Sequence, residues 1–273
     1  MFNSKDSGKK MALISPKKAE EEALDIINRV IAENRTISEF ENAKLLASLD
    51  SLYRSNSSSY YELATCYYSQ IADIDNLLIC VDKAFNSAVD VSLLNVFYAL
   101  NNAVRYKEIY KYITENNIFI EDRHFIESAI KAFSFCGDDE LVDRFSSFYR
   151  KSFTDENSVD FLEHIDEIIA FFNKNNDIKS DLVSYLLDCL DVFSRTSLFK
   201  SKGIDSAYGF SHHVYSDEGY EFLAFSFVFQ VEESYIDNIM DIEDEFISII
   251  SRINYDPTVK TKISFNFELG DLS

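Results

Sequence analysis

The feature that most limits the fold of this chain is its scarcity of glycine and proline. Gly137 is the only glycine between Gly8 and Gly203, and no proline occurs between Pro16 and Pro257. Strand-rich proteins place turn residues about every ten positions, because each short strand must reverse. The 273-residue chain is 47% hydrophobic, which is enough to bury one or two cores. The sequence therefore predicts a globular, mainly α-helical protein.

Apolar residues keep a helical spacing up to about residue 200. Leu24, Ile27 and Val30 are three apart and fall on one face of a first predicted helix. Thr36, with Glu39 three residues later, predicts a capping box at the start of the second helix. Nine further amphipathic runs are predicted as helices, near residues 36–53, 59–71, 74–88, 91–104, 106–116, 121–135, 138–151, 158–173 and 178–198.

Short connections between these runs predict antiparallel helical hairpins. Three successive pairs, 59–88, 91–116 and 121–151, begin about 30 residues apart, a period typical of helix-pair solenoids. Large and small apolar residues alternate on their facing helices, as in Phe125, Ala129, Ala132, Phe133, Gly137, Leu141, Phe145 and Phe148, and in Tyr60, Ala64, Tyr67 and Ala84. On these residues, positions 59–151 resemble a degenerate tetratricopeptide-like array. The resemblance implies a concave face that binds a protein or peptide, and it implies no specific binding residue.

A different pattern begins after residue 200, where Gly203, Gly209 and Gly219 fall within 17 residues. Residues 207–215 and 220–231 flank a short polar connection and predict a β-hairpin. In the second strand Leu223, Phe225, Phe227, Phe229 and Val231 alternate with the residues between them, so one face of the strand is apolar.

A helix over 233–254 and a last strand over 263–269 complete the prediction for the C-terminal region. The helix is predicted from one apolar stripe formed by Ile236, Ile239, Met240, Phe246, Ile247, Ile250 and Ile253, and Asp256-Pro257 is predicted to end it. The predicted fold class is therefore mainly α, a helical-hairpin (tetratricopeptide-like) solenoid or bundle followed by a small C-terminal β-β-α-β module. The predicted organisation is a disordered basic tail (1–18), a helical domain (19–200) and a small acidic α+β module (203–273).

The charge balance favours a protein partner over nucleic acid or membrane. The chain has 47 acidic and 26 basic residues, a formal net charge of −21, which disfavours binding to phosphate backbones and anionic lipids. Residues 203–251 hold eleven acids and no Lys or Arg. This surface is interpreted either as a solvated face that aids solubility or as a docking site for a basic protein. The candidate partner-binding residues are Asp217, Glu218, Asp241, Glu243, Asp244 and Glu245.

Enzyme signatures are absent from the sequence. It contains no glycine-rich phosphate loop, no nucleophile elbow and no zinc-binding helix motif, so no catalytic, cofactor-binding or metal-ligating residue is predicted, and no cofactor. His212 and His213 fall in the first predicted strand, where neighbours point to opposite faces. A small hydrolase built on one of them with Asp217 is retained as a minor alternative.

The four cysteines, Cys66, Cys80, Cys136 and Cys189, have no paired metal-binding spacing and are predicted to be reduced core residues. A cytoplasmic location is predicted from them and from the lack of a signal-peptide core or an apolar run long enough to span a membrane.

The sequence as a whole predicts a non-enzymatic protein–protein interaction module. The first hypothesis is an adaptor or regulatory scaffold that binds a peptide or helix in a helical groove. The alternative is an acidic inhibitor, immunity protein or antitoxin that neutralises a basic partner.

Overall fold

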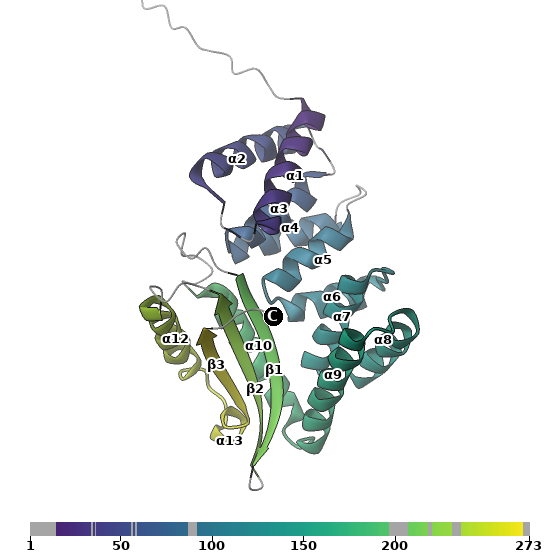
Figure 1. The fold of residues 1–273 in the computed structure, drawn as a ribbon, viewed down its shortest axis with the longest axis vertical. Coiled ribbons are helices and arrows are strands. Elements are labelled where there is room, and N and C mark those ends of the chain that lie inside the picture. Colours follow the sequence, from purple (N-terminus) through teal and green to yellow (C-terminus); the bar gives the residue numbers. More distant parts are fainter. Residues whose placement is uncertain are drawn as a thin grey trace, which may run out of the picture.

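The computed structural model describes residues 15–33, 35, 37–55, 57, 59–86, 92–196, 207–217, 220–230 and 236–269. Ten helices come first in the described chain: α1 (Pro16–Ala32), α2 (Glu39–Arg54), α3 (Ser59–Gln70), α4 (Ile74–Asn86), α5 (Leu93–Asn102), α6 (Tyr106–Asn116), α7 (Arg123–Phe135), α8 (Asp139–Ser152), α9 (Glu156–Lys174) and α10 (Lys179–Arg195). The C-terminal region contains β1 (Ala207–Asp217), β2 (Tyr220–Gln230), α12 (Ile236–Ile250), α13 (Pro257–Lys260) and β3 (Ile263–Leu269). The predicted fold class is confirmed (Figure 1).

The helices up to α8 pair in chain order, and the odd-numbered helices pack side by side. Helices α1 and α2, α3 and α4, and α7 and α8 contact each other extensively, and α3 also packs on α5, α5 on α7, and α7 on α9. No residue of α3 is more than partly exposed to solvent, and the only exposed residues of α5 and α7 are Tyr98 and His124. Helices α3, α5 and α7 are therefore the inner layer of the array, and α4, α6 and α8 face solvent.

Three hairpins of this array share the same turn. Ala72, Val104 and Gly137 stand between their two helices with φ of 53°, 56° and 68°, in the left-handed region. The N–H of the residue after each of them donates to a carbonyl five residues back, at 3.0, 2.9 and 3.0 Å. This is the Schellman closure of a helix, repeated at intervals of 32 and 33 residues. The predicted spacing of the helix pairs thus has a matching backbone geometry.

Helix α10 crosses the turn end of all three hairpins and forms one ion pair with each. At the α7–α8 turn it comes so close that a Cβ on Gly137 would lie 3.0 Å from Lys179 Cε. The three ion pairs are Lys179–Asp139, Asp191–Arg105 and Arg195–Asp75. Because each hairpin supplies one partner, α10 braces the array along its length.

The C-terminal strands form one sheet in the order β1-β2-β3, with β1 antiparallel and β3 parallel to β2. Leu223, Phe225 and Phe227 are buried, as the alternating pattern predicts. Phe227 stacks on Phe193 of α10 with ring centroids 3.5 Å apart, and it meets Phe246 of α12 at 6.3 Å. The edge strand β1 packs against α9.

Two hydrophobic clusters make up the core of the described residues. The smaller one joins α1, α2 and α3 with Cys80, whereas the larger one runs from α4 to β3. Helices α4 to α10 and the C-terminal sheet therefore share one core. Division into independent domains at residue 200 stays a prediction, and the segment 197–206 and residues 1–14 of the predicted tail lie outside the described residues. Helix α1 begins at Pro16, after Ser15, and its first turn falls inside the predicted tail.

Two local predictions were wrong. The capping box of α2 is formed by Ser38 and Glu41, two residues further along the chain than the predicted pair, Thr36 and Glu39. Thr36 itself lies outside the described residues. Helix α12 ends at Ile250, and Pro257 starts α13 instead of ending the longer helix.

The predicted apolar stripe of α12 divides between two faces of the helix. Phe246 of the predicted stripe is buried, together with Ile242, which the stripe did not include, whereas Met240 and Ile247 of the stripe are exposed on the opposite side.

Candidate functional site

The best candidate for a binding surface is the inner face of α5, together with the adjoining part of α3. Three residues occupy equivalent positions on the inner helices, because each stands six residues before the left-handed residue of its turn. They are Cys66 on α3, Tyr98 on α5 and Lys131 on α7. Lys131 is half-buried beside the sheet, whereas Tyr98 is 40% exposed. The inner face is thus covered by the chain's own sheet at α7 and open to solvent at α5.

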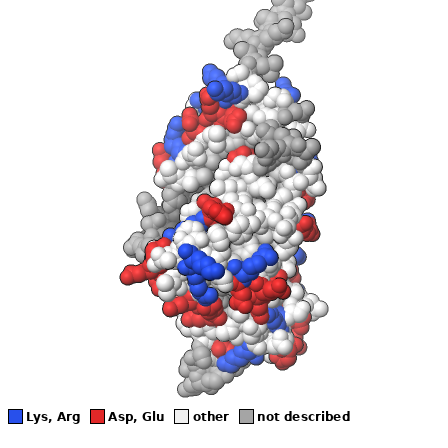
Figure 2. Space-filling view, turned by 90° about the vertical axis from the view of Figure 1, so that its right-hand side faces the viewer, with Lys and Arg blue, Asp and Glu red and all other residues white. Residues whose placement is uncertain are grey.

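The open part of this face carries almost no charge. Helix α5 has no acidic or basic residue, and α3 has only Glu62. Most of the partly exposed side chains there are aromatic or uncharged polar: Tyr60, Tyr61, Tyr68, Ser69, Gln70, Asn95, Tyr98, Asn101 and Asn102. Leu94 adds an aliphatic side chain. Figure 2 shows a broad area with few charged residues at the height of α3 to α5, between two more highly charged regions. Interface centres are depleted in charge and enriched in Tyr, so this composition is typical of a protein-binding surface.

Hydrogen bonds between α3 and α5 hold the two helices of this face together. The Ser69 hydroxyl donates to the Ala99 carbonyl oxygen at 3.0 Å, and Asn95 Nδ2 donates to the Glu62 carboxylate. The latter bond also gives the single charge of α3 an internal partner. A surface that is ordered before binding loses less entropy when a partner docks.

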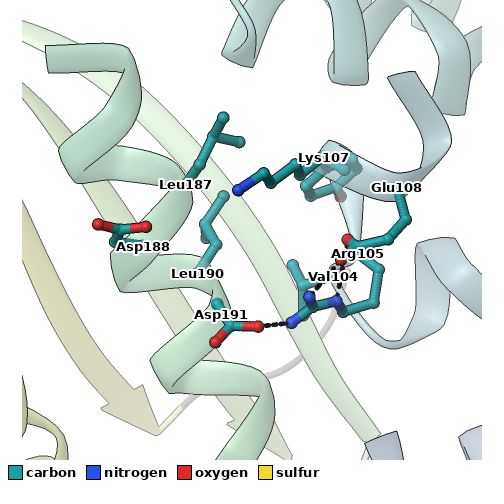
Figure 3. Close-up of a pocket in the computed structure, with 9 residues that line it drawn as sticks. Val104, Arg105, Lys107, Glu108, Leu187, Asp188, Leu190 and Asp191 are labelled. Carbon is teal, nitrogen blue, oxygen red and sulfur yellow. Dashed lines mark hydrogen bonds and ion pairs between the residues drawn. The ribbon is translucent and has the colours of Figure 1, made fainter. Parts of the chain in front are cut away.

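A cavity of about 180 Å³ lies between the α5–α6 turn and α10 (Figure 3). Arg105, which is only 6% exposed, donates to Glu108 at 3.0 and 2.5 Å, to Ser194 Oγ at 3.0 Å and to Asp191. On the other side of the cavity, Asp188 accepts a hydrogen bond from the Tyr255 hydroxyl at 2.8 Å. These groups already have partners within the chain. The cavity is therefore best explained as a gap in the packing contact between α10 and the helical array, and not as a ligand site.

The turn beside this cavity breaks two local rules. Val104 is a β-branched residue in the left-handed region, where the third turn has Gly137. Arg105 occupies the position at which Asp73 and Asp138 accept hydrogen bonds from the following helix, and its side chain bonds to α10 instead. Local strain and an absent cap are therefore compensated by the long-range ion pair.

The predicted acidic residues divide between the two ends of the module. Asp217 ends β1, Glu218 lies outside the described residues, and the other four share α12. On α12, Asp241 and Asp244 are exposed and Glu243 and Glu245 are half-buried. The structure thus places four of the six candidates on one helix, next to the exposed Met240 and Ile247.

In the fold, the segment 203–251, which contains no Lys or Arg, does contact lysines from other parts of the chain. Glu221 on β2 lies 3.0 Å from Lys174 Nζ of α9, and Lys262 donates to the Glu221 backbone carbonyl at 3.1 Å. The sequence pattern could not show this, because both lysines lie outside the segment.

His212 and His213 do point to opposite sides of β1, since His212 is buried and His213 exposed. Asp217 lies four and five residues beyond the two histidines on the same extended strand, a backbone separation of roughly 13 and 16 Å. His164 of α9 lies beside both histidines, a neighbour that the sequence analysis missed because His164 stands alone in its helix. Within the described residues no group of three His, Cys, Asp or Glu side chains is arranged to hold a metal ion.

The four cysteines are free thiols, and Cys80 and Cys189 are buried. Burial raises the pKa of Cys189 to about 12, as expected for a structural residue and not for a nucleophile. None of the described helices is long and apolar enough to cross a membrane. In comparisons with known proteins, no family model, no curated protein and no solved structure matches this chain.

Proposed function

We propose that this protein is a non-enzymatic interaction module in which α3 to α8 form a tetratricopeptide-like array and the α3–α5 face binds a peptide or helix of another protein. The observation that carries the proposal is the open, uncharged, Tyr- and Asn-rich inner face in a chain of net charge −21. Side-chain amides offer both donors and acceptors, so they suit the backbone of a bound segment. The four free thiols support a reducing, cytoplasmic setting for this function.

A second candidate function is supported by α12. Met240 and Ile247 are 59% and 46% exposed on one side of the helix, and acidic residues surround them. An exposed apolar pair within acidic surroundings is complementary to a basic amphipathic partner, as the inhibitor or antitoxin hypothesis requires. Converting Asp241, Glu243, Asp244 and Glu245 to amides should then slow association by about tenfold or more at low salt, and by much less at high salt.

Photo-crosslinking from Tyr98 tests the first function. A photoreactive amino acid at position 98 is expected to trap a specific protein in extracts of the source organism, and the same group at Val159, which is 52% exposed on α9, is not. The trapped protein is then purified, and its affinity is measured directly by calorimetry. Tyr98→Asp should weaken binding at least tenfold, because it buries a charge at the centre of the interface, and Val159→Asp should change it less than twofold. Equal effects of the two substitutions would contradict the proposal.

A further inference from the structure

Three of the four histidines of the chain meet where the C-terminal sheet contacts the helical array. His164 projects from α9, and its ring centroid lies 5.3 Å from that of His213 and 6.0 Å from that of His212 on β1. His212 is only 8% exposed and packs edge-on against Phe135 of α7 at 5.7 Å. His164 is about 50 residues from the two adjacent histidines of β1, so only the fold brings it to them.

The ammonium group of Lys131 lies close to this cluster. Lys131 of α7 is half-buried, its Nζ lies 5.8 Å from the centroid of Phe161, and it interacts electrostatically with His212. A buried ammonium next to imidazoles raises the cost of placing a further positive charge there.

The carboxylates around the cluster offset this charge only in part. On α7, Glu127 faces Lys131, but it already accepts from Arg123 Nε at 2.9 Å and from the Tyr149 hydroxyl at 2.5 Å. On α9, Glu167 lies 3.8 Å from His164 Nδ1 and is largely exposed. Strand β2 presents uncharged residues here, since Phe225 and Ala224 stand opposite His212 and His213.

We propose that this contact is an acid-sensitive latch, in which protonation of His212 beside Lys131 loosens β1 from α7 and α9 at mildly acidic pH. Imidazole is the side chain whose charge changes in this pH range, and a buried imidazolium beside an ammonium is disfavoured both by its burial and by charge repulsion. A loosened latch exposes the inner face of α7, next to the face of α5 that is already open. The latch itself does not depend on the function proposed for that face.

The direction of the effect follows from proton linkage. Burial, together with Lys131 and the two other histidines, lowers the pKa of His212 from its ordinary 6.5 to about 3. With β1 docked, His212 stays neutral down to low pH, whereas with β1 detached it takes up a proton at about pH 6.5. Detachment of β1 therefore becomes more favourable as the pH falls below about 6.5. A difference of one proton changes the open fraction by up to about tenfold per pH unit.

Hydrogen exchange measured by mass spectrometry tests the latch on the full chain, with protection factors corrected for the intrinsic effect of pH. Between about pH 7.5 and 5.5 the protection of β1 and of the second half of α7 should fall about tenfold, since one proton is taken up on opening. Helices α1 and α2, which belong to the separate smaller core, should keep their protection. A uniform loss over the whole chain, or no loss in β1, would overturn the proposal.

Two variants and a control make the test specific. His212→Phe keeps an aromatic ring against Phe135 and should abolish the pH dependence. Lys131→Met removes one cause of the lowered pKa of His212 in the docked state, so the loss of protection should level off at a higher pH than in the parent. His124→Gln, at the exposed start of α7, should behave like the parent. If His212→Phe does not fold, the parent decides alone, because unchanged protection of β1 between about pH 7.5 and 5.5 contradicts the latch. The same holds for His212→Phe if it folds and still opens with acid.

Discussion

Replacing Gly137 with alanine tests whether α10 and the hairpin turn constrain each other. The residue has φ of +68°, where an L-amino acid with a Cβ is strained by about 1–2 kcal/mol. The added Cβ would also lie 3.0 Å from Lys179 Cε and 3.1 Å from Val183 Cγ2, so these two side chains of α10 must give way slightly. Alanine restricts the unfolded chain, which returns about 0.4–1 kcal/mol. The expected net result is a loss of about 1–2 kcal/mol in the free energy of unfolding.

Urea unfolding followed by far-UV circular dichroism measures this loss, provided that the m-value is unchanged. Lys179→Ala should reduce the part of the effect due to crowding, and the double-mutant cycle separates it from the backbone strain. Ala72→Gly is the matched control at the equivalent turn: it relieves strain, but it removes a buried methyl group and loosens the unfolded chain, so its net effect should stay within about 1 kcal/mol of zero. An unchanged or raised stability of Gly137→Ala would refute the reasoning.

Three further predictions concern the ion pairs and the shared core. Hydrogen bonds from Arg35 and Ser38 lower the pKa of Glu41 to about 2. The stabilisation that the Glu41 carboxylate gives to the fold is therefore present above about pH 4.5 and lost as the pH falls toward 2, and in urea titrations Glu41→Gln should flatten this part of the dependence of stability on pH. Arg105→Met should destabilise the fold by about 1–3 kcal/mol, because it leaves the half-buried carboxylates of Glu108 and Asp191 without this cation, and adding Asp191→Asn should recover part of the loss in thermal unfolding. Phe193→Ala should cost about 3–5 kcal/mol and keep a single transition by calorimetry, whereas two transitions would show that the array and the sheet unfold separately.

The sequence predicted most of the secondary structure, because the signals for it are local. Apolar spacing predicted ten helices before residue 200, and the described residues of that region form ten. The period-two pattern of Leu223, Phe225 and Phe227 identified the buried strand. The start of α2 shows the limit of such signals. Thr36 with Glu39 and Ser38 with Glu41 both match the capping-box pattern, and the choice between them is made by Arg35, which donates to both oxygens of Glu41 at 2.8 Å.

The candidate site depended on knowing which faces are covered. The sequence singled out the acidic residues, and four of them do share α12, but it could not show that Met240 and Ile247 are exposed beside them. Nor could it show that α5 has an open face, since Lys131 and Tyr98 both lie on predicted amphipathic helices and only the packing of β1 distinguishes them.

What the sequence determined by itself was the set of elements, since helix and strand preferences depend on residues a few positions apart. What only the tertiary structure decided was how those elements brace one another. The ion pairs between α10 and the hairpin turns join residues 40, 86 and 120 positions apart, and the histidine cluster joins α9 to β1. Such contacts leave no local pattern in the sequence, because the type of a charged or aromatic residue does not show whether its side chain contacts water or a distant helix. The covered face of α7 and the open face of α5 therefore follow from the packing of the whole chain.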